Sequence, residues 1–129
     1  MRDLVFSDST AKAQLEAIVH PLVKAEMHRQ IGASKTAIVV LDLPLLAESN
    51  ALNGWRPQLD QVVVVDCLES TQIARVVARS QMTEEQVRAV IGNQALRLER
   101  LAIADKVIVN NDLSLIDLKV AVKTAIIDK

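Results

Sequence analysis

The sequence is poor in glycine, cysteine and aromatic residues, and each shortage excludes a class of function. Its 129 residues include three glycines, which lie too far apart for the phosphate loops G-x-x-x-x-G-K-[ST] and G-x-G-x-x-G. The single cysteine, Cys67, permits no disulfide within the chain and no multi-cysteine metal cluster. With one Phe, one Trp and no Tyr, the chain offers few rings on which nucleic-acid bases could stack.

Charge excess and long apolar runs are missing as well. Fifteen basic and sixteen acidic residues give a net charge of -1, so no overall field favours nucleic acid or an anionic membrane. The longest apolar run, residues 37–41, is far shorter than the roughly 18 residues that a membrane-spanning helix needs. The first residues contain no apolar core of a signal peptide. We therefore expect a cytoplasmic protein that binds neither nucleic acid nor a membrane.

Half of the residues are apolar and 24% are charged, which indicates one compact domain over residues 1–129. The first third is helical in pattern. Asp8 or Ser9 can cap a helix that runs to a break at His20 and Pro21, and a second helix extends from Pro21 to Gly32. We therefore predict a helical region over residues 1–34.

Three short segments rich in β-branched residues predict strands near residues 37–42, 62–66 and 106–109. Their continuous apolar character is typical of parallel strands that are buried on both faces. Helix formers occupy residues 69–103, with an interruption at 80–82 and a capping box from Thr83 to Gln86, and a last helix covers 113–127. The alternation predicts an α/β fold with a short parallel sheet of about three strands flanked by helices.

Polar residues follow each predicted strand, and ligands of open parallel sheets bind at these carboxyl ends. Asp42 follows the first strand, Asp66 ends the second, and Asn110 and Asn111 follow the third. A carboxylate there could hold hydrated Mg²⁺ or accept a proton from a hydroxyl. It could equally cap a helix or form an Asx turn.

Histidine and cysteine give no metal or nucleophile motif. His20 follows Glu16 by four residues and precedes His28 by eight, which matches no H-E-x-x-H pattern. A hydrogen-bonding role of His20 in a cap or with a substrate explains it as well. No histidine lies near Cys67 in the sequence to activate its thiol. We expect no metal ligands.

Two arginine pairs could capture phosphate. Arg75 and Arg79 lie one helical turn apart, and Arg97 and Arg100 are spaced i, i+3. Guanidinium groups bind phosphate oxygens in a bidentate manner. Solvated helix faces that pair with Glu84, Glu85 or Glu99 explain the same spacings.

Several segments, taken in order, resemble dephospho-CoA kinases over nearly the whole chain. They are LEAIVHP at 15–21, VVLDLPLLAE at 39–48, VVVVD at 62–66, QALRLER at 94–100 and ADKVIVNN at 104–111. The resemblance implies ATP-dependent transfer of the γ-phosphate to the ribose 3'-hydroxyl of dephospho-CoA, the last step of coenzyme A synthesis. It also implies Mg²⁺ and a P-loop kinase fold.

The resemblance also implies roles for individual residues. Region 1–34 would receive dephospho-CoA, and residues 69–103 would form a helical lid over the phosphates. The substrate-binding residues would be His20, Pro21, Pro44, Leu45 and Glu48; the catalytic residues on the lid would be Arg79 and Arg97; the residues that bind ATP would be Arg100, Asn110 and Asn111.

This sequence departs from the family at its start, because the family has a Walker A loop ahead of these segments and none can be written here. We therefore expect a truncated P-loop kinase-like fold that is inactive alone and binds neither ATP nor Mg²⁺ tightly. Its partners would be dephospho-CoA or CoA, a complementary N-terminal P-loop segment, or another copy of the chain. The alternatives are a noncatalytic module that binds CoA or dephospho-CoA, and a decayed truncated homologue.

The resemblance places the P-loop strand between the strands at 37–42 and 61–66. Without that strand, apolar backbone edges would be left unpaired, at about 1–3 kcal/mol for each buried group that lacks a hydrogen bond. We expect these two strands to pair directly, or to pair with another copy of the chain.

Overall fold

The computed structural model describes residues 8–48 and 54–127, so positions 1–7 of the predicted N-terminal helical region lie outside the described part. The chain divides into two compact units, Met1–Asp42 and Leu43–Lys129. In the described ranges, no helix combines the length and the apolar character that crossing a membrane requires. The single-domain organisation remains a prediction.

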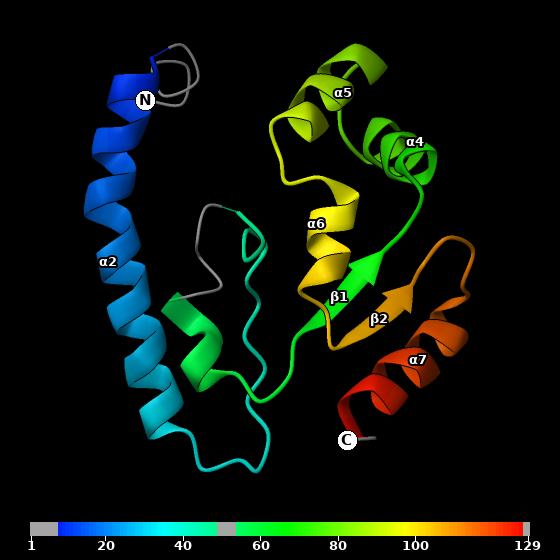
Figure 1. The fold of residues 1–129 in the computed structure, drawn as a ribbon. Helices are drawn as coiled ribbons and strands as arrows, with labels where there is room; N and C mark the ends of the chain where they lie inside the picture. The colour runs from blue at the N-terminus through cyan, green and yellow to red at the C-terminus, as the bar shows by residue number, and fades with distance from the viewer. Residues whose placement is uncertain (1–7, 49–53, 128–129) are drawn as a thin grey trace. The chain divides into compact units, whose positions relative to one another are not determined.

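The first unit is built on one long helix, α2, Ser9–Ala33 (Figure 1). The Asp8 carboxylate caps it by accepting hydrogen bonds from the backbone N–H groups of Thr10 (2.9 Å) and Ala11 (3.2 Å), as predicted. The predicted break at Pro21 is wrong, because Pro21 lies inside a continuous helix. A proline removes one hydrogen bond of the helix ladder, and the turns on both sides hold the helix together.

Residues 37–42 form no strand, so the prediction of a strand there is wrong. The sheet in the described part of the chain has two strands, and residues 37–42 form neither of them. Apolar β-branched residues favour extended backbone, but a strand also requires a hydrogen-bonded neighbour. The sequence pattern alone could not supply that neighbour.

The second unit contains the parallel sheet, formed by β1 (Val63–Asp66) and β2 (Lys106–Val109). The register pairs Val63 with Lys106 and Asp66 with Val109. Helices connect the two strands, as parallel pairing demands (Figure 1). Both predicted strands are therefore confirmed, and their carboxyl ends lie at the same edge.

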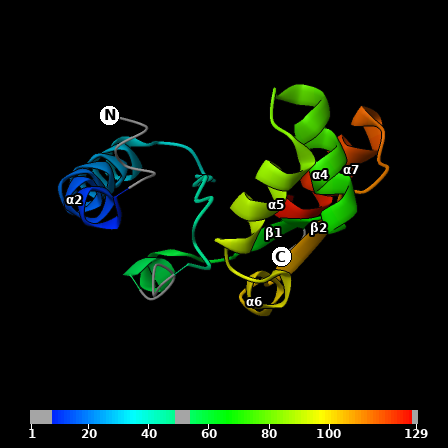
Figure 2. The same cartoon turned by 90° about the horizontal axis from the view of Figure 1, so that it is seen from above.

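In the described residues of this unit, a short 3-10 helix, η1 (Arg56–Gln58), precedes β1. Four α-helices accompany the sheet: α4 (Glu69–Arg79), α5 (Glu84–Gly92), α6 (Arg97–Ala102) and α7 (Leu115–Ile127). Figure 2 shows α4 and α5 on one side of the sheet and α6 on the other. The predicted interruption at 80–82 separates α4 from α5. The predicted capping box is confirmed: Gln86 N–H donates to Thr83 Oγ1 at 3.2 Å, and Thr83 N–H donates to Gln86 Oε1 at 2.9 Å.

The core of the second unit is small, and one part of the sheet is uncovered. The buried apolar residues are Trp55, Val62, Ile73, Val87, Ala95, Ile108 and Ala125. Val65, Val107 and Val109 remain 62%, 43% and 51% exposed. The prediction that the strands are buried on both faces is thus wrong for these residues, because the described helices cover only part of a two-stranded sheet.

Candidate functional site

The carboxyl end of β1 carries a buried carboxylate paired with an arginine from α6. Asp66 is 5% exposed. It accepts hydrogen bonds from Arg97 Nε at 2.9 Å and 3.1 Å and from Arg97 Nη2 at 2.6 Å. Arg97 is the first residue of α6, and its side chain is 43% exposed. The pair therefore ties the start of α6 to the edge of the sheet where ligands of such folds bind.

This pairing changes the acidity of both groups. The hydrogen bonds from Arg97 hold the pKa of Asp66 below its usual range, and the positive charges of Arg97 and Arg100 act in the same direction, whereas burial opposes them. The same hydrogen bonds raise the pKa of Arg97. Asp66 is therefore a carboxylate at neutral pH and is a poor proton acceptor.

The partner of Arg97 is not among the acidic residues considered from the sequence. Glu99 accepts from the backbone N–H of Leu96 at 2.8 Å, and Glu84 pairs with Arg88 at 2.8 Å. The sequence indicates Asp66 only as a candidate for Mg²⁺ binding, for proton transfer, or for a cap. The signal that could have found the pair is a lone acidic residue at the end of an apolar strand, which requires a cation when it is buried.

The segment before α6 is held by a second carboxylate. Glu48, half-buried after the turn that contains Pro44 and Leu45, accepts a hydrogen bond from the backbone N–H of Ala95 at 2.7 Å. Arg100 Nη1 donates to the carbonyl oxygen of Ala95 at 2.6 Å. Both peptide groups of this buried residue are thus bound by charged side chains. The turn at 44–48 and the motif QALRLER are therefore one connected structure.

A third cluster holds the loop after β2. Arg75 donates to the carbonyl oxygens of Asn110 at 2.7 Å and of Asn111 at 2.5 Å. Asn111 Oδ1 accepts from the backbone N–H of Leu68 at 2.8 Å, and Asn110 N–H donates to the Asp66 carbonyl at 2.8 Å. Arg75, one of the candidate phosphate ligands, is thus occupied with backbone, and the two asparagines lie at the carboxyl edge of the sheet.

The other predicted site residues lie on exposed surface. Arg79 is the last residue of α4, and its side chain is exposed. Pro44 and Leu45 are exposed in the turn, with Leu45 at 55%. His20 and Pro21 are exposed in the middle of α2. Within the second unit, the structure brings together Arg97, Arg100 and Glu48 around the start of α6.

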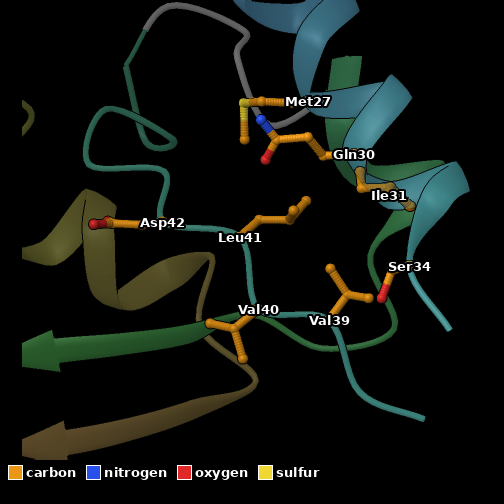
Figure 3. A pocket seen from close by; sticks show the side chains of 8 residues that line it. All are labelled: Met27, Gln30, Ile31, Ser34, Val39, Val40, Leu41 and Asp42. Atoms are coloured by element: carbon orange, nitrogen blue, oxygen red, sulfur yellow. The ribbon is translucent and has the colours of Figure 1, made fainter. Parts of the chain in front are cut away.

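The first unit contains a groove of its own, of about 370 Å³ (Figure 3). Its lining residues are Met27, Gln30, Ile31, Ser34, Val39, Val40, Leu41 and Asp42. Figure 3 shows Val39 and Leu41 pointing toward the end of α2, whereas Val40 and Asp42 point away. The groove is therefore lined by apolar side chains from α2 and from residues 39–41, and the Gln30 amide, the Ser34 hydroxyl and the Asp42 carboxylate are its polar groups.

Within residues 8–48 and 54–127, no three His, Cys, Asp or Glu side chains come together as a metal site would require. Cys67, next to Asp66, is half-buried. Among the described side chains, the arginines can bind anions and the polar groups can form hydrogen bonds.

Comparison with known proteins decides the family. The family model described as "Dephospho-CoA kinase" matches residues 1–115. The chain belongs to the dephospho-CoA kinase family. It is 50% identical over 118 residues to the dephospho-CoA kinase of Burkholderia thailandensis, with 92% of this chain and 57% of the relative covered. The dephospho-CoA kinase of Aromatoleum aromaticum is 52% identical over 111 residues, with 86% of this chain and 53% of the relative covered.

A solved structure confirms the fold class. The crystal structure of TT1252 from Thermus thermophilus matches with a TM-score of 0.77 and 34% identity, covering 95% of this chain and 61% of that one. The expected α/β fold with a short parallel sheet is therefore confirmed for this member of the dephospho-CoA kinase family, with two strands in the described residues in place of three. The chain spans about half the length of the curated relatives that it matches.

Proposed function

We propose that this chain supplies the part of a dephospho-CoA kinase that binds the acceptor and closes over the phosphates. The reaction is transfer of the ATP γ-phosphate to the 3'-hydroxyl of dephospho-CoA. The observation that carries the proposal is the family match over residues 1–115, which includes the motif QALRLER with Arg97 fixed at the carboxyl edge of the sheet.

The first unit is the acceptor region in this proposal. Dephospho-CoA has a pantetheine arm with apolar segments and amides. The groove suits such an arm, because apolar walls with a few polar groups are typical of ligand pockets. Its lining residues include the apolar Met27, Ile31 and Leu41 and the polar Gln30 and Ser34. His20 and Pro21 on α2 are assigned to acceptor binding in this unit. Pro44, Leu45 and Glu48 belong to the second unit and are assigned to acceptor binding on the family resemblance alone.

The second unit is the phosphate region. Arg97 and Arg79 face the transferring phosphates, and Arg100, Asn110 and Asn111 serve ATP binding. Arginine suits this work because its planar donors match phosphate oxygens, and preorganised cations stabilise the charge of the transition state. The side chain of Arg97 is 43% exposed, so an anion can reach it.

The described residues fit a phosphate group better than they fit a metal ion. Arginine donors are present, whereas no cluster of three metal-ligating side chains occurs in the described part. In the family Mg²⁺ offsets phosphate charge during transfer. The residues of this chain bind and orient the acceptor, hold phosphate oxygens by N–H donors, and exclude water when the lid closes.

The groove of the first unit also supports a second candidate function. In it, the chain is a noncatalytic module that binds CoA or dephospho-CoA. Both candidates predict that the isolated chain forms no CoA from ATP and dephospho-CoA, because the loop that cradles the β- and γ-phosphates supplies much of the catalysis in such transfers. They differ in whether phosphoryl transfer appears when the rest of the family sequence is added.

The proposal is tested by calorimetric titration of the chain with dephospho-CoA. We expect saturable binding that Leu41→Asp weakens at least tenfold, or about 1.4 kcal/mol, because the new carboxylate lies in the apolar wall of the groove. Ile38→Asp is the matched control, since Ile38 is an exposed aliphatic residue of the same segment and does not line the groove. Absence of binding, or equal weakening by both variants, would contradict an acceptor site in the first unit.

A further inference from the structure

The guanidinium of Arg97 can donate hydrogen bonds along two edges, and Asp66 accepts along only one of them, the Nε/Nη2 edge. Of its five N–H donors, Asp66 takes the one on Nε and one on Nη2. Both N–H groups of Nη1 and the second one of Nη2 have no acceptor among residues 8–48 and 54–127. The free edge is a two-nitrogen fork on a side chain that is 43% exposed.

The edge that Asp66 holds is fixed firmly. Asp66 is 5% exposed and stands at the end of a strand whose register with β2 is set by backbone pairing. Its own carbonyl oxygen accepts from Asn110 N–H. Glu48 and Arg100 bind the two peptide groups of Ala95, just before α6. The carboxylate and the start of α6 are thus held independently, so the guanidinium plane is restrained at both ends.

We propose that Asp66 is a positioning residue that holds one edge of Arg97, so that the free Nη1/Nη2 fork is presented to the phosphate oxygens of the ligand. This inference rests on the proposed function, because it takes the ligand of Arg97 to be a phosphate. It assigns to Asp66 neither metal binding nor proton transfer. Preorganisation of this kind reduces the side-chain entropy that a flexible arginine loses on binding.

A second role for Asp66 would have the opposite consequence. If Asp66 merely neutralised Arg97, removal of its negative charge would strengthen the binding of any anion at this place. If Asp66 positions Arg97, removal of its charge releases the guanidinium and weakens the binding of an anion that needs the fork. The sign of the change in affinity therefore separates the two roles.

The test uses the full chain, labelled with ¹⁵N, and sodium tripolyphosphate as the probe, with the arginine Nε–H signals followed by NMR. Before any ligand is added, the Nε–H of Arg97 should exchange with water more slowly than that of Arg88. Arg88 is the matched internal control, because it also binds a carboxylate through Nε (3.2 Å) and Nη2 (2.8 Å), but both partners of that pair are exposed. Equal exchange rates would overturn the proposal without any substitution.

Tripolyphosphate should then shift the Arg97 signal in a saturable way. Asp66→Asn, which keeps the shape and loses the charge, should raise the dissociation constant at Arg97 by about tenfold, and Asp66→Glu should recover part of the affinity. Glu84→Gln should change nothing at Arg97. Equal or tighter binding by Asp66→Asn, or no saturable shift in the unsubstituted chain, would overturn the proposal.

Failure of this inference and failure of the proposed function give different results. The groove titration with dephospho-CoA does not involve Arg97. If dephospho-CoA binds but Asp66→Asn does not change the dissociation constant of tripolyphosphate at Arg97, only the positioning role of Asp66 is refuted. Loss of dephospho-CoA binding with a normal tripolyphosphate response removes the acceptor site and leaves Asp66 as the residue that positions Arg97.

Discussion

Replacement of Arg97 by methionine should destabilise the second unit far more than replacement of an exposed arginine. The substitution removes the three hydrogen bonds that Arg97 donates to the Asp66 carboxylate, which is 5% exposed. Loss of one partner from a buried pair costs about 3–5 kcal/mol, whereas exposed pairs contribute about 0–1 kcal/mol. Since the Arg97 side chain is 43% exposed, we expect an intermediate loss of about 2–3 kcal/mol.

Urea unfolding followed by the fluorescence of Trp55 measures this loss. Trp55 is the sole tryptophan and is 8% exposed in the same unit. With a slope of about 1.5–2 kcal/mol per M, the unfolding midpoint should fall by about 1–2 M urea. Arg88→Met is the control, because the partners of Arg88, Glu84 and Glu69, are exposed. It should change the free energy of unfolding by less than about 1 kcal/mol.

The double variant Asp66→Leu with Arg97→Met tests whether the unpaired charge of Asp66 causes the loss of stability. Without the carboxylate, no buried charge is left unpaired, and apolar residues in place of both partners can be nearly neutral. We expect the double variant to recover at least half of the stability that Arg97→Met loses. A double variant less stable than Arg97→Met, or an Arg97→Met variant as stable as Arg88→Met, would show that the buried charge does not determine the cost.

Three further predictions concern pH, a cap and a proline. Arg97 lowers the pKa of Asp66 below its usual value of 3.8, so the pair's contribution to the free energy of unfolding is fully present above the unfolded-state pKa of about 3.9 and is lost as the pH falls through the folded-state pKa. The difference in free energy of unfolding between the unsubstituted chain and Arg97→Met should therefore narrow below about pH 4 in urea titrations. A difference that stays constant with pH would contradict this. Thr83→Ala removes the cap of α5 and should cost about 1 kcal/mol in the same assay, with Thr83→Ser retaining most of the stability. Pro21→Ala should stabilise α2 by up to about 3 kcal/mol, seen as slower amide hydrogen exchange in that helix; unchanged exchange would show that Pro21 does not strain it.

The local signals in the sequence were reliable where a residue determines its own surroundings. Asp8 caps α2, and Thr83 and Gln86 form the capping box, because each of these bonds spans only two or three residues. The strands at 63–66 and 106–109 follow from short β-branched runs. The capping hydrogen bonds depend on spacing alone, and spacing is visible in a sequence.

The errors arose where the outcome depends on distant partners. Residues 37–42 have a strand-like composition but no strand assignment, since pairing requires a neighbour that composition does not specify. Pro21 sits in the interior of a helix because long flanking turns outweigh one lost hydrogen bond. The partner of Arg97 lies 31 residues away in the chain, and no spacing rule connects Asp66 to it. The site was therefore foreseeable as a set of residue types but not as a set of contacts.

Phosphoryl transfer after complementation tests the central claim most directly. The chain is mixed with the part of the Burkholderia thailandensis dephospho-CoA kinase that it does not match, together with dephospho-CoA, Mg²⁺ and ATP labelled at the γ-phosphate. We predict that label appears at the 3'-position of CoA in the mixture, and that neither polypeptide alone produces it. Binding of dephospho-CoA by the chain without any labelled CoA from a stably associated mixture would contradict the kinase assignment and favour the noncatalytic module.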